Sequence, residues 1–195
     1  MLSALPEAWG WRSPESGKLK MARAFVGVGS NIEPAENVKK ALRLLASKVR
    51  IVEISNVYST EAEGKPDQPS YYNCVAEIET NIPPEELKQT VLRKIELNLD
   101  RKRSKDKFAP RTIDLDLILY GDLVQKTDDL VLPDPQIPTR PFLAIPLFEL
   151  EPDLILPGVN LPIKKAAVQL KPVRMKPLKS YTKILKKEIL HGKRD

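Results

Sequence analysis

Histidine and cysteine are almost absent from this chain of 195 residues, with one of each, His191 and Cys74. A single cysteine cannot form a disulfide within the chain, so nothing indicates an oxidising compartment. Because the only histidine lies near the C-terminus, a Ser-His-Asp triad and an H-E-x-x-H zinc site are excluded. Carboxylates, cations and backbone amides remain as working groups, and they suit phosphoryl-type transfer, which depends on positioning and charge neutralisation.

Long hydrophobic runs are absent as well. Nowhere do eighteen apolar residues stand together, as a membrane span requires, and the N-terminal region lacks the apolar core of a signal peptide. We therefore predict a cytoplasmic protein without membrane contact. Residues 1–20 mix Trp, Pro and Gly without periodicity, and we expect a disordered leader there.

The charge of the chain is unevenly distributed. The chain is 42% hydrophobic and 30% charged, which allows one globular domain with a substantial core. The formal net charge is +6, yet eleven Lys and Arg residues and only two Asp and Glu residues lie in 164–195. We predict a folded domain over 21–163 that binds no nucleic acid. Residues 164–195 are then a basic extension, typical of a solvated tail, with an acidic partner as the alternative role.

The most informative segment is RKRSKDKFAPRTIDLDLILYG, which spans Arg101–Gly121. Side chains alternate along a strand, so Asp114 and Asp116 project to one face. The apolar residues that alternate with them project to the other face: Ile113, Leu115, Leu117 and Leu119. Mg²⁺ is usually held by one or two carboxylates plus substrate phosphates, and arginine binds phosphate oxygens bidentately. Taken alone, a D-x-D pair and a basic loop are more often solvated surface, but their convergence favours a site for a metal and a polyphosphate.

Hydrophobic periodicity predicts an α+β fold. Strands are expected over 24–29, 49–58, 71–80 and from 114 onward, with amphipathic helices over 34–47 and from 83 onward. This βαββαβ order predicts a ferredoxin-like sandwich, a mainly antiparallel sheet with helices on one face. A hairpin within 121–132, a short helix over 141–150 and a marginal helix over 181–190 complete the expectation.

The segment APRTIDLDLILYG resembles the signature of 6-hydroxymethyl-7,8-dihydropterin pyrophosphokinase, a folate-pathway family. Shorter segments fit the same pattern over residues 22–163: Gly29-Ser30-Asn31, Tyr58-Ser59-Thr60, the run from Asp67 to Asn73, and Arg140-Pro141-Phe142. The resemblance implies transfer of pyrophosphate from ATP to the hydroxymethyl group of the pterin, with release of AMP. It also implies a ferredoxin-like fold and two Mg²⁺ ions per active site.

The resemblance implies a role for each matching residue. The two Mg²⁺ ions would be held by Asp114 and Asp116, and these carboxylates would act with Arg101 and Arg111 in catalysis. The implied ATP-binding residues are Glu96, Arg103, Lys107, Leu117 and Arg140. The implied pterin-binding residues are Thr60, Tyr71, Asn73, Phe108 and Phe142. Without the family, surface salt bridges and core packing would be the more common roles of these residues.

Two departures from the family pattern reverse charge. Asp129 stands where the family commonly has arginine, and Asp134 stands where it commonly has histidine. An acidic group beside triphosphate repels it unless a cation compensates, so we expect weaker ATP binding than in a typical member. Two alternatives remain open: a noncatalytic paralogue, and an RNA-binding ferredoxin-like module. The absence of an aromatic-rich strand argues against the RNA-binding module.

Overall fold

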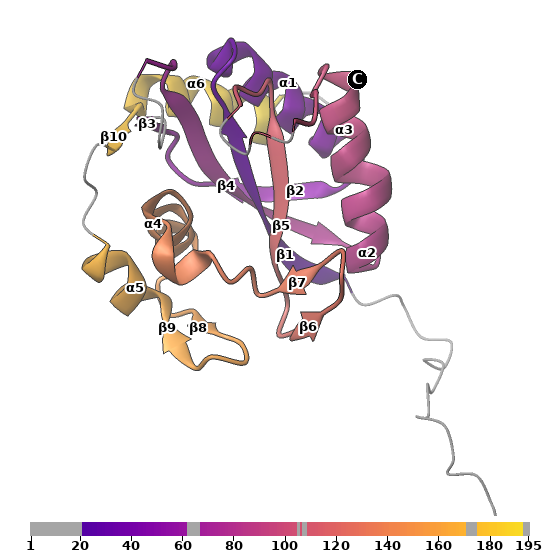
Figure 1. The fold of residues 1–195 in the computed structure, drawn as a ribbon, viewed down its shortest axis with the longest axis vertical. Coiled ribbons are helices and arrows are strands. Elements are labelled where there is room, and N and C mark those ends of the chain that lie inside the picture. The colour runs from indigo at the N-terminus through magenta and orange to yellow at the C-terminus, as the bar shows by residue number, and fades with distance from the viewer. Residues whose placement is uncertain (1–20, 62–66, 105, 107–108, 171–174, 193–195) are drawn as a thin grey trace, which may run out of the picture.

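The structure is a computed structural model that describes residues 21–61, 67–104, 106, 109–170 and 175–192 (Figure 1). A mainly antiparallel sheet carries helices on both of its faces. In chain order the elements are β1 (Ala22–Ser30), α1 (Pro34–Ala46), β2 (Arg50–Ile54), β3 (Tyr58–Thr60), β4 (Tyr71–Thr80), α2 (Pro84–Glu86), the π-helix η1 (Leu87–Leu92), α3 (Arg93–Asn98), β5 (Asp114–Tyr120), β6 (Gln125–Lys126), β7 (Val131–Leu132), the 3₁₀ helix η2 (Ile137–Thr139), α4 (Pro141–Leu150), β8 (Ile155–Leu156), β9 (Leu161–Pro162), α5 (Ile163–Gln169), β10 (Met175–Pro177) and α6 (Lys179–Leu190).

The central sheet has the strand order β10-β3-β4-β1-β5, and β2 also pairs with β4. All of these pairs are antiparallel. The expected mixed architecture with a mainly antiparallel sheet is therefore confirmed. Within the segment where a hairpin is expected, β6 pairs with β7.

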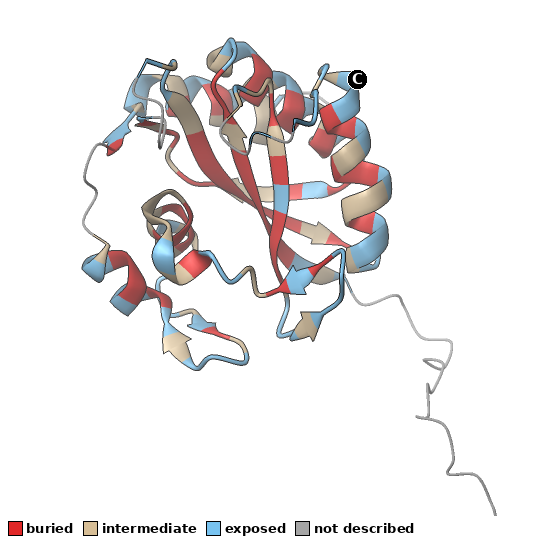
Figure 2. Ribbon diagram, viewed as in Figure 1, coloured by how far each residue is buried: buried red, intermediate tan, exposed pale blue. Residues whose placement is uncertain are grey.

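Apolar side chains form a core on each face of the sheet. On one face Ala24, Val26 and Val28 of β1 pack with the apolar stripes of α1, η1 and α3. On the other face Phe25 of β1 and Val75 of β4 pack beneath α4 and α5. The expectation of helices on one face only was wrong, because the second face also has an apolar half that α4 must cover. Figure 2 shows the central strands as the most buried part of the molecule.

A β-bulge interrupts the alternation of β5. Phe25 lies opposite Leu119 and Val26 lies opposite Leu117, so Ile118 is the extra residue on β5. As a result Leu119 packs with Ile118 in the core beneath α4, whereas Leu115 and Leu117 pack in the core beneath α1. The prediction that Leu119 shares a face with Leu115 and Leu117 was wrong for this reason.

The strand expected over 49–58 is split into β2 and β3. Ser55 lies between them, and its amide donates to the carbonyl of Val75 at 2.9 Å. The amide of Val75 donates in return to the Ser55 hydroxyl oxygen at 2.9 Å. Because a side chain replaces a carbonyl in this exchange, the chain bends away from the ladder at Ser55.

The C-terminal helix α6 packs on the domain. Thr182 and Leu185 are buried, and Leu185 joins the core that α1 covers. The surrounding lysines leave the outer face of the helix polar. The interpretation of this part as a solvated tail therefore does not hold for α6, although the domain boundary at residue 163 stays a prediction.

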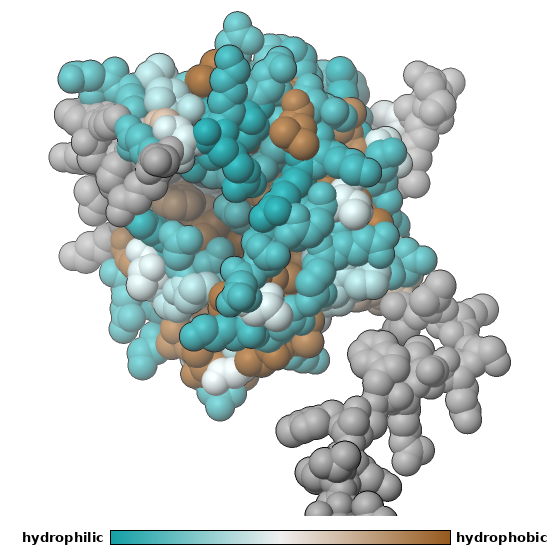
Figure 3. Space-filling view, turned by 45° about the vertical axis from the view of Figure 1, so that its right-hand side comes forward, coloured by the Kyte–Doolittle hydropathy of each residue, from teal (hydrophilic) through white to brown (hydrophobic). Residues whose placement is uncertain are grey.

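The surface view in Figure 3 is mostly hydrophilic, with hydrophobic atoms gathered at its lower end. Within the described ranges, no helix is long and apolar enough to cross a membrane.

The packing of α6 predicts different costs for two neighbouring substitutions. Leu185→Ala removes a side chain that is 1% exposed, and it should lower the free energy of unfolding by about 2–4 kcal/mol. Ile184→Ala on the same turn removes a side chain that is 59% exposed and should change it by less than about 0.5 kcal/mol. Urea unfolding followed by circular dichroism measures both values. Equal effects of the two substitutions would show that α6 does not contribute to the core.

Candidate active site

The register of three strands places a polar patch on the part of the sheet face that α4 does not cover. In one row Asn73 of β4 lies opposite Gly29 of β1, and Gly29 lies opposite Asp114 of β5. In the next row Gly27 lies opposite Asp116. An amide on one strand and two carboxylates on another are thus separated only by the bare backbone of β1.

Because Gly27 and Gly29 have no side chains, β1 adds no bulk to this surface. A Cβ atom at Gly29 would lie 2.8 Å from Oδ1 of Asn73, which is closer than such contacts allow. A Cβ atom at Gly27 would lie 3.2 Å from Cδ2 of Leu143, in the first turn of α4. The side chain of Asn73 can therefore lie across β1, and α4 can approach the sheet closely.

Asp114 is surrounded by two arginines. Nη1 of Arg111 lies 2.5 Å from Oδ2 of Asp114, and Nη2 of Arg101 lies 3.7 Å from Oδ1. The loop that carries Arg111 is fixed to the end of β1, because the Arg111 amide donates to Oδ1 of Asn31 at 2.7 Å. The Arg111 guanidinium also lies 5.9 Å from the ring centroid of Tyr71. The two predicted catalytic arginines and one of the two predicted metal ligands thus lie together.

The Arg101 guanidinium has a buried hydrogen-bond donor that is not paired with any described residue. Its side chain is 11% exposed, and among the described residues its buried Nε atom has no hydrogen-bond partner. A buried guanidinium that is incompletely bonded favours an anion nearby, since each unsatisfied donor costs free energy.

Glu96 fixes the start of β5. Its Oε1 atom accepts a hydrogen bond from the amide of Leu115 at 2.9 Å, and its Oε2 atom accepts one from Arg103 at 2.9 Å. Burial raises the pKa of this carboxyl and the charge of Asp114 adds to the shift, whereas the Leu115 amide and Arg103 oppose it. Glu96 therefore acts here as a support of the strand that carries both aspartates.

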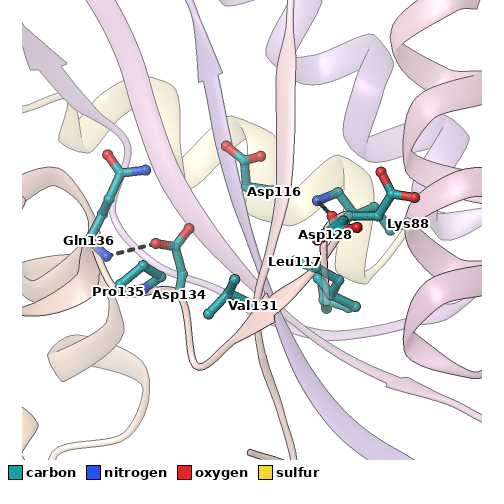
Figure 4. Close-up of a pocket in the computed structure, with 10 residues that line it drawn as sticks. Lys88, Asp116, Leu117, Asp128, Val131, Asp134, Pro135 and Gln136 are labelled. Atoms are coloured by element: carbon teal, nitrogen blue, oxygen red, sulfur yellow. Dashed lines mark hydrogen bonds between the residues drawn. The ribbon is translucent and has the colours of Figure 1, made fainter. Parts of the chain in front are cut away.

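Asp116 opens into a hollow of about 270 Å³ (Figure 4). The hollow is rich in carboxylates, with Asp128 and Asp134 on its wall. Asp134 lies on one side of β5 in Figure 4, and Lys88 lies on the other side near Asp128. The residues that line the hollow are Lys88, Asp116, Leu117, Asp128, Asp129, Leu130, Val131, Asp134, Pro135 and Gln136.

Burial and neighbouring charges perturb two of the carboxylates that line this hollow. Asp116 keeps an exposed edge, but the surrounding protein removes much of its hydration and raises its pKa to about 7. The charges of Asp114, Asp134 and Glu96 add to the shift. The ammonium group of Lys88 opposes it. Burial likewise raises the pKa of Asp134, against a hydrogen bond from the Gln136 amide and the charge of Lys88. The site therefore has an excess of negative charge that a cation would relieve.

The two aspartates fit Mg²⁺ as carboxylate ligands of a shared site. In the part of the chain that the structure describes, no group of three or more His, Cys, Asp or Glu side chains forms a complete metal site. Mg²⁺ does not need one, because it is commonly bound by one or two carboxylates, with substrate phosphates and water supplying the remaining oxygens. Within the described ranges Asp116 has no salt bridge, which leaves its oxygens available.

The predicted pterin-binding residues are brought together in part. Nδ2 of Asn73 donates to the Thr60 hydroxyl at 2.6 Å, and Tyr71 lies opposite Thr60 in the β3–β4 ladder. Phe142 lies in the first turn of α4 and packs against the core beneath that helix. Phe108 falls outside the described residues, so its predicted role stays untested.

The predicted ATP-binding residues are more scattered. Leu117 lines the hollow beside Asp116, and Arg103 is held by Glu96. Arg140 precedes α4, and its amide donates to the carbonyl of Gln136 at 2.9 Å. Lys107 lies outside the described residues.

The sequence did not identify Lys88 as a site residue. It lies in the π-helical turn η1, and its Nζ atom donates to the carbonyl of Asp129 at 2.5 Å. In the sequence it is one lysine among several on a polar helix face, so periodicity gives no signal for it. Only the packing of the helix against the β6–β7 segment brings its charge to the hollow.

Comparison with known proteins gives consistent matches. The family model described as 7,8-dihydro-6-hydroxymethylpterin-pyrophosphokinase matches residues 25–152. A protein of Haemophilus influenzae named 2-amino-4-hydroxy-6-hydroxymethyldihydropteridine pyrophosphokinase is 35% identical over 144 residues, which cover 72% of this chain and 89% of that protein. A protein of Aquifex aeolicus with the same name is 36% identical over 146 residues, covering 74% of this chain and 90% of the other.

Solved structures agree at the level of the fold. The crystal structure of wild-type HPPK-DHPS from Plasmodium falciparum with SDX-DHP matches with a TM-score of 0.61 and 12% sequence identity. The match covers 80% of this chain and 47% of that chain, so this chain spans about half the length of that protein.

The raised pKa of Asp116 predicts a pH-dependent effect of one substitution. The folded protein holds the pKa of Asp116 above its ordinary value of 3.8. Ionisation of Asp116 therefore lowers the free energy of unfolding as the pH rises from about 4 to about 7. Without divalent cations, Asp116→Asn should therefore be more stable than the wild type at pH 8, by about 1 kcal/mol given the exposed edge, and the difference should vanish near pH 4. Urea unfolding at both pH values measures it. Asp122→Asn, an exposed position after β5, is the control, and an identical pH trend there would contradict the assignment.

Proposed function

The chain belongs to the 7,8-dihydro-6-hydroxymethylpterin-pyrophosphokinase family, and we propose that the polar patch at the start of β5 is its active site. The protein transfers pyrophosphate from ATP to the hydroxymethyl group of 6-hydroxymethyl-7,8-dihydropterin, a step of folate biosynthesis. The hydroxymethyl oxygen forms a bond to the β-phosphorus of ATP, the bond from that phosphorus to the oxygen bridging the α- and β-phosphates breaks, and AMP leaves.

One observation carries the assignment of the site. Asp114, with its two arginines, lies in the same row of the sheet as Asn73, and only Gly29 stands between them. Groups that bind phosphate and a group that can hydrogen-bond a heterocycle are thus within reach of one small substrate pair. Such proximity is the main source of rate in phosphoryl-type transfer.

We propose that Asp114 and Asp116 hold two Mg²⁺ ions together with the ATP phosphates. When bound, the ions would neutralise phosphate charge and make the β-phosphorus more electrophilic. The proposal is supported by the charges of Asp114, Asp134 and Glu96, which oppose the ionisation of Asp116 in addition to its loss of hydration and which positive charge would offset. Both aspartates stand on a strand whose start is fixed by Glu96, so their separation is set by the backbone.

Arg101 and Arg111 are proposed to bind phosphate oxygens. Both guanidinium groups lie beside Asp114. On nucleotide binding they would exchange part of this contact for phosphate, and the incompletely bonded Nε of Arg101 supports such an exchange. The anchoring of Arg111 to Asn31 keeps its backbone in place while its side chain changes partner.

On the pterin side, Asn73 would hydrogen-bond the edge of the ring, since an amide both donates and accepts. Its orientation is set by the hydrogen bond to Thr60. Tyr71, Phe108 and Phe142 are proposed to shape or sandwich the flat heterocycle, because aromatic faces stack on such rings.

On the nucleotide side, the hollow lined by Asp116 and Leu117 is proposed to receive ATP. As the family resemblance implies, the residues proposed to bind ATP are Glu96, Arg103, Lys107 and Arg140. The acidic wall of the hollow, which includes Asp129 and Asp134, opposes the triphosphate. Lys88 lines the same hollow on the other side of β5 from Asp134 and would offset part of this repulsion.

Three finer expectations remain proposals: the ferredoxin-like classification of the sheet, the cytoplasmic location, and an acidic partner for the basic tail.

Replacing either aspartate should abolish most of the activity. Asp114→Ala and Asp116→Ala should each reduce Mg²⁺-dependent AMP formation more than a hundredfold, at about 1.4 kcal/mol of barrier per decade, because each removes a proposed metal ligand. AMP release from ATP and the pterin alcohol is measured in steady state. Asp122→Ala serves as control and should leave the rate unchanged, since Asp122 is exposed after the strand. Undiminished turnover in Asp116→Ala would remove that residue from the proposed site.

Lys88 should affect ATP and not the pterin. Lys88→Met should raise the KM for MgATP about fivefold, roughly the 1 kcal/mol expected of one charge near the surface, and leave the KM for the pterin unchanged. Lys94→Met, an exposed position on α3, is the matched control. An equal rise in both KM values, or none, would show that the Lys88 charge does not act on the nucleotide.

A further inference from the structure

Strand β3 is a short element close to one edge of the sheet. It consists of Tyr58–Thr60 and pairs with β4 on one side and with β10 on the other. In the outer ladder Met175 lies opposite Thr60, and Pro177 lies opposite Tyr58. Without β10, this three-residue strand would be the edge of the sheet, where pairing is weakest.

The residue before β3 is held by the start of α6. The amide of Val57 donates to the hydroxyl oxygen of Thr182 at 2.9 Å, and the amide of Leu178 donates to the carbonyl of Val57 at 2.8 Å. The Thr182 hydroxyl in turn donates to the carbonyl of Leu178 at 3.0 Å. Val57 is fully buried and Thr182 is 4% exposed, so this closed set of hydrogen bonds is shielded from water.

Several tertiary contacts hold α6 against the rest of the domain. The rings of Tyr181 and Tyr72 meet edge to face at 5.6 Å, and the Tyr181 hydroxyl donates to the carbonyl of Ala35 in α1 at 2.5 Å. Two salt bridges add to this: Arg43 with Glu188 at 2.9 Å, and Lys186 with Glu53 at 3.0 Å. An isolated helix of twelve residues would be marginal, so α6 owes its order to these tertiary contacts.

We propose that β10 and the first turns of α6 position the pterin side of the active site, with Thr182 as a positioning residue. This inference rests on the proposed function, because it takes Asn73 and Thr60 as part of the pterin site. Thr182 and Leu178 hold Val57, Met175 pairs with Thr60, and the Thr60 hydroxyl sets the orientation of the Asn73 amide. Both C-terminal elements lie outside residues 25–152, the part that matches the family model.

The arrangement predicts an effect on one substrate only. The contacts of α6 with Val57, the residue before β3, lie toward the edge of the sheet away from β5, since β4 and β1 intervene in the strand order. Loosening Val57 would therefore disturb Thr60 and Asn73 but leave Asp114 and Asp116 in place. A general loss of stability would instead reduce the active fraction and leave both KM values unchanged.

The test compares three full-length variants with the wild type. Thr182→Val keeps the shape of the side chain and removes its hydroxyl, and it should raise the KM for the pterin about fivefold, since small misplacements of a binding group weaken positioning. The KM for MgATP should stay unchanged. Thr182→Ser restores the hydroxyl and should restore the KM for the pterin. Lys183→Ala, at the exposed neighbouring position, should match the wild type.

Hydrogen exchange supplies a readout independent of catalysis. In Thr182→Val the amide of Val57 should exchange at least about tenfold faster than in the wild type, because it loses its buried acceptor. If the wild type released no AMP, the proposed function would fail, and unchanged exchange at Val57 would separately overturn the positioning role. In an active enzyme, an unchanged KM for the pterin in Thr182→Val, or no rescue by Thr182→Ser, would also overturn it. Should Thr182→Val not fold, Thr182→Ala, which removes the same hydroxyl, takes its place under the same criteria.

Discussion

The antiparallel pairing of β1 with β4 and β5 is the constraint on which the site depends. It fixes Asn73, Gly29 and Asp114 in one row across three strands. Because Gly29 has no side chain, the groups on its two sides face one shared space and are not divided by a ridge. A larger residue there would push the Asn73 amide aside, so the glycine matters for the surface above the sheet and not for the conformation of β1.

A second constraint is electrostatic. Carboxylates gather at the start of β5 and around the adjoining hollow, and the pKa of Asp116 is raised first by its loss of hydration and then by the charges of Asp114, Asp134 and Glu96. Arg101 and Arg111 balance Asp114, and Lys88 balances the opposite wall only in part. Ionisation of Asp116 in these surroundings is therefore unfavourable. It becomes favourable when cations arrive, which links the proposed metal binding to nucleotide binding.

Local alternation in the sequence was enough to predict the pairing of Asp114 and Asp116 on one face and the main strands and helices. It could not predict the β-bulge at Ile118, because that depends on the register in which β5 pairs with β1. The bend at Ser55 was missed for a similar reason, since its partner Val75 lies twenty residues away. Lys88 was missed because the charge of a surface lysine says nothing about which wall it will face. Local sequence patterns could not predict the features that depend on contacts between residues far apart in the sequence.

The C-terminal segment shows how composition can mislead about such contacts. Its high density of lysine indicated a solvated tail, yet a few apolar and hydroxyl side chains, with Thr182 and Leu185 foremost, are sufficient to seat α6. Lysines on the outer face do not oppose this packing, because they keep their charges in water while the inner face is buried. This segment covers the edge of the sheet next to Thr60. It therefore contacts a residue of the proposed pterin site, although its composition is typical of a solvated tail. The folded unit that presents the site therefore extends beyond the residues that identify the family.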